Sequence, residues 1–197
     1  QSKFDGNVIP LVVNVCNFPP ENEDGVILLS FEQVETLFHE FGHALHGLLS
    51  EANYPSLSGT SVTRDYVEFP SQMMENWARE PEVIKSFARH YKTGESIPDD
   101  LLAKISEAGT FNEGFGTTEY VAAAHLDMAW HTNEEQISDV NAFEQKALDD
   151  LGLIPEIATR YRSTYFGHIF AGGYSSGYYS YLWTEVLEAD AFEPFKE

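Results

Sequence analysis

Apolar positions recur with helical spacing along most of the chain, and a strand-like pattern is confined to its first part. Intervals of three and four residues between apolar positions are typical of helices that bury one face. Ser30 followed by Gln33 fits a capping box at the start of the first such helix. We expect helices over residues 31–49, 66–80, 82–91, 99–108, 117–130, 141–151, 156–166 and 175–191.

The valine-rich run at residues 8–18 predicts a strand, and residues 25–29 predict a short return strand after a polar turn. No internal repeat or low-complexity tract interrupts the 197 residues. The expected fold class is therefore mainly α, with a small β element near the N-terminus.

Charge and composition narrow the possible partners. With 32 acidic residues against 11 Lys and Arg, the formal net charge is -21, so we expect no binding to nucleic acid or to an anionic membrane. No apolar run approaches the length of a membrane span. The chain starts at Gln1 without a signal-peptide pattern, and we expect residues 1–197 to be a single piece of a longer, cytoplasmic protein.

The helix predicted at 31–49 carries the sequence H-E-x-x-H at residues 39–43. Residues four apart in a helix are about 40° apart around its axis, so His39 and His43 point the same way and suit one zinc ion. Glu40 follows the first histidine and can move a proton from a water to a leaving amine. The alternative is a chance match, but buried histidines without a partner are unfavourable.

A catalytic zinc ion usually takes a third protein ligand. The next predicted helix offers Glu68 and Glu75, between which spacing does not decide, and Glu51 is less well placed. His46 could also be a ligand by spacing, although we prefer to interpret it as a polar residue at the helix edge.

A second candidate constellation lies at residues 165–186, YFGHIFAGGYSSGYYSYLWTEV. If this stretch is helical, Tyr174, Tyr178 and Tyr181 share one face, and their hydroxyls could donate to a developing oxyanion. His168 could do the same or could hold substrate. The alternative interpretation is an aromatic core stripe. The glycines at 167, 172 and 173 favour a closely approached backbone.

Three stretches taken together, FHEFGHALHGLLS, RDYVEFPSQMMENW and FGHIFAGGYSSGYYSYLW, resemble the thimet oligopeptidase family of zinc metallopeptidases. The resemblance covers nearly the whole chain, and RDYVEFPSQ, ARHYKTG and LDMAWH are most similar to its bacterial peptidyl-dipeptidase Dcp branch. It implies a zincin-like helical catalytic lobe that binds one Zn²⁺ ion.

The resemblance implies that His39, His43 and Glu68 are the zinc ligands and that Glu40 is the general base. It also implies that His168 and the three tyrosines bind substrate and stabilise the transition state. The expected activity is release of dipeptides from the C-termini of short peptides. The alternatives are a general oligopeptidase that cleaves internal bonds and an inactive zinc-binding fragment.

Family members are several times longer than this chain. The resemblance therefore places these residues in part of the catalytic domain and implies a missing N-terminal lobe of the same protein. Because the substrate channel needs both lobes, we expect the chain alone to be weakly active or inactive.

Overall fold

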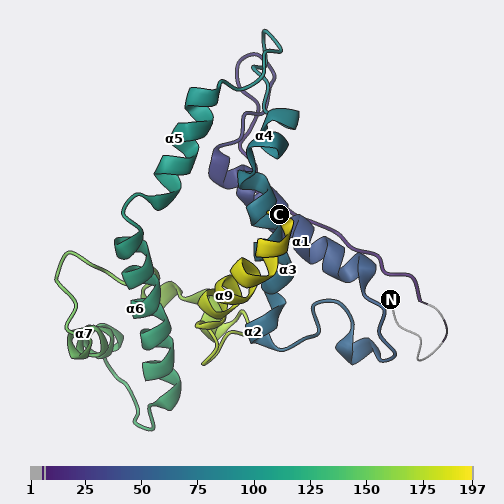
Figure 1. Cartoon of the computed structure of the whole chain (residues 1–197). Coiled ribbons are helices and arrows are strands. Elements are labelled where there is room, and N and C mark those ends of the chain that lie inside the picture. Colours follow the sequence, from purple (N-terminus) through teal and green to yellow (C-terminus); the bar gives the residue numbers. More distant parts are fainter. Residues whose placement is uncertain (1–5, 7, 197) are drawn as a thin grey trace. The chain divides into compact units, whose positions relative to one another are not determined.

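The computed structural model describes residue 6 and residues 8–196, and helices dominate this part of the chain (Figure 1). The chain divides into two compact units, one formed by Gln1–Lys104 with Leu182–Glu197 and the other by Ile105–Tyr181. None of the helices in the described residues has the length and apolar character needed to cross a membrane.

The first unit is built on the pairing of α1 (Phe31–Leu49) with α3 (Phe69–Arg79). Ser30 caps α1 as predicted: its side chain accepts from the amide of Gln33, and the Gln33 side chain accepts from the amide of Ser30. An ion pair of 2.6 Å between Arg79 and Glu35 also joins the two helices.

Further elements complete the first unit. They are η1 (Pro55–Leu57), α2 (Arg64–Val67), α4 (Pro81–Phe87), the first part of α5 (Asp99–Thr110), most of α9 (Ser180–Phe192) and η3 (Glu193–Phe195). Trp77 on α3 contacts Phe192 and Phe195, with ring centroids 5.1 and 5.6 Å apart, and so attaches the end of the chain to α3.

The second unit contains α6 (Glu113–Thr132), α7 (Val140–Asp150), η2 (Ser163–Tyr165) and the short α8 (Gly167–Phe170). Its core cluster joins Ala123 of α6 to Phe166, Ile169 and Tyr178, all at most 3% exposed. This cluster packs the long α6 against the glycine-rich segment that follows α8.

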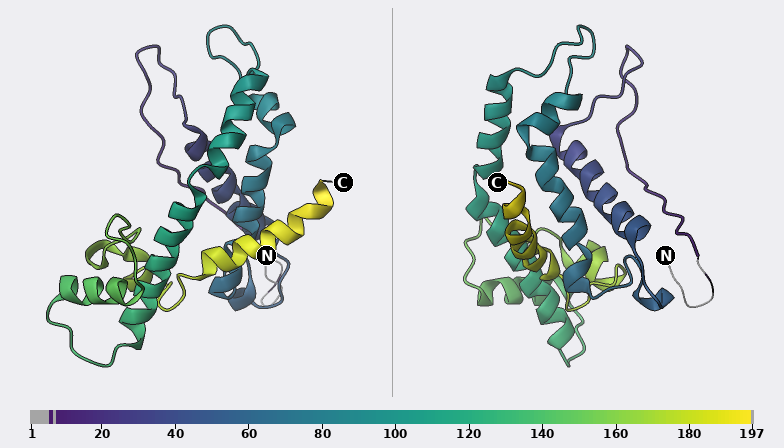
Figure 2. Two further views of the ribbon diagram at one scale, coloured as in Figure 1. Left: turned by 60° about the vertical axis from the view of Figure 1, so that its left-hand side comes forward. Right: turned by 45° about the vertical axis from the view of Figure 1, so that its right-hand side comes forward.

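The predicted β element was wrong for the described residues. Residues 9–18 are extended but lie in no strand, and isolated bridges such as that between Arg89 and Ser96 make no sheet in the described part of the chain. Figure 2 shows the extended segment running along α1, where the Val12 side chain lies beside Gly47. The valine-rich pattern marks an extended backbone, but a strand also needs a neighbouring backbone to receive its hydrogen bonds.

Four helix predictions also need correction. The helix predicted at 82–91 corresponds to α4, which ends at Phe87, and Arg89 lies in the isolated bridge to Ser96. The predicted helix 66–80 is broken at Glu68, which lies between α2 and α3. Residues 156–166 form mostly irregular backbone and η2 instead of a helix, and residues 175–179 form turns before α9 begins at Ser180.

Candidate metal centre

The two histidines of the H-E-x-x-H sequence and Glu68 converge in the first unit. Glu68 Oε2 lies 3.3 Å from His39 Nε2 and 3.1 Å from His43 Nε2. Glu68 is only 4% exposed, and one ligand atom from each of the three residues falls within 4.8 Å of the others. The structure thus brings together the predicted pair and one of the two carboxylates between which the spacing did not decide.

The spacing of these atoms fits a single zinc ion. Two ligand atoms that each lie about 2.0–2.1 Å from a tetrahedral zinc ion are about 3.3 Å apart from one another. Both Glu68–imidazole distances are close to this value. A buried carboxylate facing two imidazole nitrogens is also the nitrogen and oxygen donor set that zinc accepts at catalytic sites.

Glu68 reaches this position because the backbone turns at that residue. The helix α2 ends at Val67, and α3 starts at Phe69 with a proline in its first turn, where a missing N–H costs little. Ser71 Oγ lies 2.7 Å from the Glu68 carbonyl oxygen and 3.1 Å from Oε2, which fixes the carboxylate orientation.

Gly42, between the two histidines, allows the close approach of α1 to α3. A Cβ atom at this position would lie 2.4 Å from the carbonyl oxygen of Pro70 and 2.5 Å from the Cα atom of Ser71. Only glycine leaves room for α3 to bring Glu68 against the two imidazoles.

Glu75 takes a different place from Glu68. Its Oε1 atom lies 2.6 Å from Nδ1 of His39, the ring nitrogen opposite to the one that faces Glu68. A carboxylate at this position orients an imidazole ligand and increases its basicity. Burial alone would lower the pKa of His39, but hydrogen bonds to Glu68 and Glu75 and the charges of both raise this pKa to about 9.

The remaining candidates on α1 lie as follows. Glu40 follows His39 directly and is half-buried. His46 is not among the converging ligand atoms; its ring lies beside Tyr66, with centroids 6.4 Å apart. Burial, with a smaller contribution from His43, lowers the pKa of His46.

The second unit gathers the other predicted residues. The His168 ring centroid lies 6.3, 5.6 and 6.4 Å from those of Tyr174, Tyr178 and Tyr181. Tyr174 stacks on Tyr181 at 5.2 Å, and Tyr178 meets Tyr181 edge-on at 5.5 Å. The cluster forms although Tyr181 is the only one of the three tyrosines that lies in a helix, so the single helix face that we expected is not what joins these side chains.

Tyr178 is 3% exposed, and its burial raises the pKa of its hydroxyl well above the usual range, against a smaller lowering effect from Arg160. A phenol that stays protonated remains a hydrogen-bond donor throughout the neutral and alkaline range. The backbone carbonyl of Tyr178 accepts a hydrogen bond from the Tyr120 hydroxyl.

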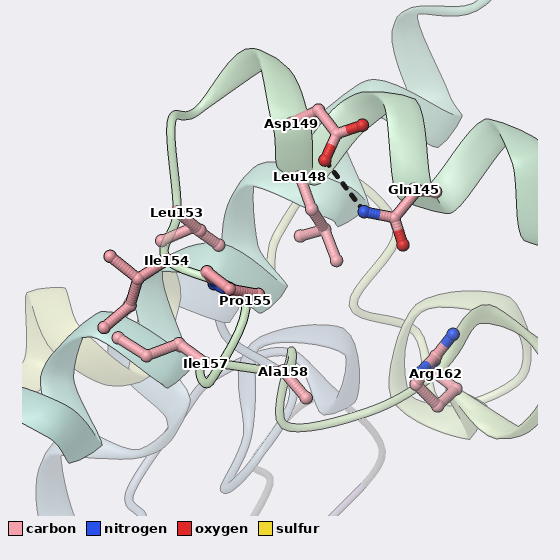
Figure 3. A pocket seen from close by; sticks show the side chains of 9 residues that line it. All are labelled: Gln145, Leu148, Asp149, Leu153, Ile154, Pro155, Ile157, Ala158 and Arg162. Carbon is pink, nitrogen blue, oxygen red and sulfur yellow. Dashed lines mark hydrogen bonds between the residues drawn. The ribbon is translucent and has the colours of Figure 1, made fainter.

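A pocket of about 340 Å³ also lies in the second unit, at the end of α7 (Figure 3). Leu148, Ile154 and Ile157 contribute apolar walls, and Gln145 donates to Asp149 at its edge over 2.8 Å. None of the predicted metal or catalytic residues lines this pocket.

Two imidazoles from α1 and a buried carboxylate at the start of α3 form a donor set that a single zinc ion accepts. Comparison with known sequences is more specific: the model for peptidase family M3 matches residues 2–197. The chain belongs to peptidase family M3, which confirms the resemblance drawn from the three motifs.

Named relatives are peptidases of several kinds. The chain is 48% identical to dipeptidyl carboxypeptidase of Escherichia coli over 191 residues, which cover 95% of the chain and 28% of the relative. It is 39% identical to oligopeptidase A of the same species over 204 residues (99% and 29%). It is 40% identical to organellar oligopeptidase A of Arabidopsis thaliana over 195 residues (96% and 24%). The chain therefore spans less than a third of the length of these relatives.

Proposed function

We propose that this chain carries the metal centre of a zinc peptidase that releases dipeptides from the C-termini of short peptides. The observation that carries the proposal is the position of Glu68 Oε2 at zinc-ligand spacing from the Nε2 atoms of His39 and His43. The 48% identity to a dipeptidyl carboxypeptidase supports this choice of activity.

In this proposal, His39, His43 and Glu68 hold one zinc ion. When bound, zinc would polarise the scissile carbonyl and lower the pKa of a water molecule. Glu40 takes the proton of the attacking water and passes it to the leaving amine. Glu75 holds the His39 ring through Nδ1, and Ser71 holds the Glu68 carboxylate.

The tyrosine cluster supplies donors for charge that develops on the substrate. Tyr174, Tyr178 and Tyr181 would donate to the oxyanion or to the peptide backbone, and His168 would help to bind substrate. The raised pKa of the Tyr178 hydroxyl supports this role, because a phenol can donate a hydrogen bond and a phenolate cannot.

A general oligopeptidase that cleaves internal bonds is the second candidate, and the identities of 39–40% to oligopeptidase A proteins favour it. An inactive zinc-binding protein would also use the three ligands, but Glu40 is present in the sequence. The cytoplasmic location and the zincin-like arrangement of the whole catalytic lobe remain predictions.

One pair of substrates separates the two activities. The zinc-loaded protein is incubated with an oligopeptide that has a free C-terminus and with the same peptide amidated there, and the products are identified by mass spectrometry. Dipeptides released only from the free peptide support the first candidate. Equal internal cleavage of both peptides supports the second. Binding of zinc without hydrolysis of either peptide, by the chain and by a longer protein that contains it, would leave the inactive alternative.

A further inference from the structure

Asp127, in the middle of α6, is a buried carboxylate that the proposed chemistry does not use. It is 1% exposed and lies on the same helix as the buried Ala123 and Leu126. A carboxylate in such a place is unfavourable unless hydrogen bonds or charges satisfy its oxygens. The hydrogen-bond partners of Asp127 therefore indicate which part of the chain it positions.

Those partners lie in the segment that carries the tyrosine cluster. Asp127 Oδ1 accepts from the backbone amide of Ser176, and Oδ2 accepts from the backbone amide of Tyr178, each over 2.9 Å. His131, one turn further along α6, places Nδ1 2.8 Å from Oδ1. Both carboxylate oxygens are thus directed at one short stretch of backbone about fifty residues away in the sequence.

The backbone of this stretch needs stabilising contacts from outside the stretch. Ser176 has a φ of 55°, a left-handed conformation that is sterically unfavourable for a residue other than glycine. The Ser176 side chain is exposed, so the support comes through its backbone amide. Local bonds add to it: the Tyr174 amide donates to the His168 carbonyl over 3.0 Å, and the Gly177 amide donates to the Tyr174 carbonyl over 2.8 Å.

We infer that Asp127 is the positioning residue of the tyrosine segment, residues 172–178. It holds the turn at Ser176 and the backbone of Tyr178, and through them it places the hydroxyls of Tyr174 and Tyr178. The catalytic part of this inference rests on the proposed function, because the tyrosines are donors only if the protein hydrolyses peptides. Displacements of about 1 Å in such groups are enough to slow catalysis strongly.

Glu144 provides a matched control in the same unit. It is also 1% exposed, accepts from a backbone amide (Ser163, 2.6 Å) and pairs with Arg162. These partners lie outside residues 172–178. Neutralising Glu144 therefore removes a buried carboxylate of the same kind without touching the tyrosine segment.

The test compares Asp127→Asn, Glu144→Gln and the unaltered full chain, all with zinc bound. Amide hydrogen exchange is measured by NMR. We expect Asp127→Asn to speed exchange at the Ser176 and Tyr178 amides at least tenfold more than at the amides of α6. Adding Ser176→Gly should restore part of the protection, since glycine adopts this φ without steric cost. Glu144→Gln should show no such selectivity, and zinc content should be equal in all proteins.

Kinetics with a short peptide form the second measurement. We expect Asp127→Asn to lower kcat at least tenfold while KM changes less than threefold, because donors to an oxyanion act in the transition state. Unchanged exchange at the two amides, or the same change in Glu144→Gln, would overturn the positioning role. Faster exchange with an unchanged kcat would overturn the inference that the position of the tyrosine segment affects catalysis. If neither the unaltered chain nor the longer protein that we expect to contain it cleaves a peptide, the proposed function fails, and the exchange data alone decide whether Asp127 holds the segment.

Discussion

Replacing Gly42 with alanine tests whether the close approach of α1 and α3 builds the metal centre. The new Cβ would meet the Pro70 carbonyl oxygen at 2.4 Å and the Ser71 Cα atom at 2.5 Å. Carbon atoms normally approach to about 3.5–4.0 Å, so α3 must move by roughly 1 Å. Both neighbours are backbone atoms, and a rotamer change cannot relieve the clash.

The displacement should affect metal binding more than folding. Overpacking of this kind costs about 1–3 kcal/mol, and the gain in helix propensity from glycine to alanine offsets about 1 kcal/mol of it. Ligand distances in a metal site tolerate only about 0.2 Å. A 1 Å shift of Glu68 away from the imidazoles should therefore weaken zinc binding by at least a hundredfold.

Gly47→Ala is the matched control for this experiment. It lies on the same helix and gains the same helix propensity, but its new Cβ would meet a side-chain atom, Cγ2 of Val12, at 2.9 Å. The Val12 side chain can move to relieve this clash, whereas the backbone atoms that face Gly42 cannot. Zinc affinity from competition with a chelator, together with urea unfolding of both variants, measures the difference. Equal zinc affinity in the two variants would refute the argument that Gly42 sets the ligand spacing.

Three further results are expected. Glu75→Gln should weaken zinc binding by about 10–100-fold without abolishing it, since it loses the support of His39 Nδ1 but no ligand; an unchanged affinity in chelator competition would contradict this. In the metal-free protein, the raised pKa of His39 adds to the free energy of unfolding. This contribution is fully present below about pH 6.5, the pKa of histidine in the unfolded chain, and is lost as the pH rises through about 9. Urea unfolding from pH 6 to 10 should show the loss, and the His39→Gln variant should not show it. Tyr178→Phe should lower kcat by about 10²-fold if its hydroxyl donates to the oxyanion, whereas Tyr165→Phe, at an exposed position, should not.

Local signals predicted the first helix well, because its determinants lie within the helix itself. The capping box at Ser30 and Gln33 is present, and the helix bounds match. Sequence spacing could not decide between Glu68 and Glu75 as the third ligand, because the backbone turn at Glu68 determines which carboxylate faces the Nε2 atoms.

Tertiary contacts explain why the main incorrect predictions from the sequence failed. Tyr174, Tyr178 and Tyr181 have helical spacing, yet hydrogen bonds from the amides of Ser176 and Tyr178 to Asp127 hold residues 175–179 in turns. An acidic residue directly after the apolar Leu126 in the predicted helix 117–130 was the available signal for Asp127. The valine-rich run failed as a strand because strand pairing depends on a distant backbone that the pattern does not reveal.

The central claim is that His39, His43 and Glu68 form one zinc site within this chain. The most direct test is zinc content by elemental analysis after mild dialysis, measured for the unaltered chain, Glu68→Gln and Glu75→Gln. We predict about one zinc ion per unaltered chain, loss of the metal in Glu68→Gln, and retention in Glu75→Gln when zinc is in excess. Full zinc content in Glu68→Gln, or none in the unaltered chain after zinc is added back, would contradict the claim.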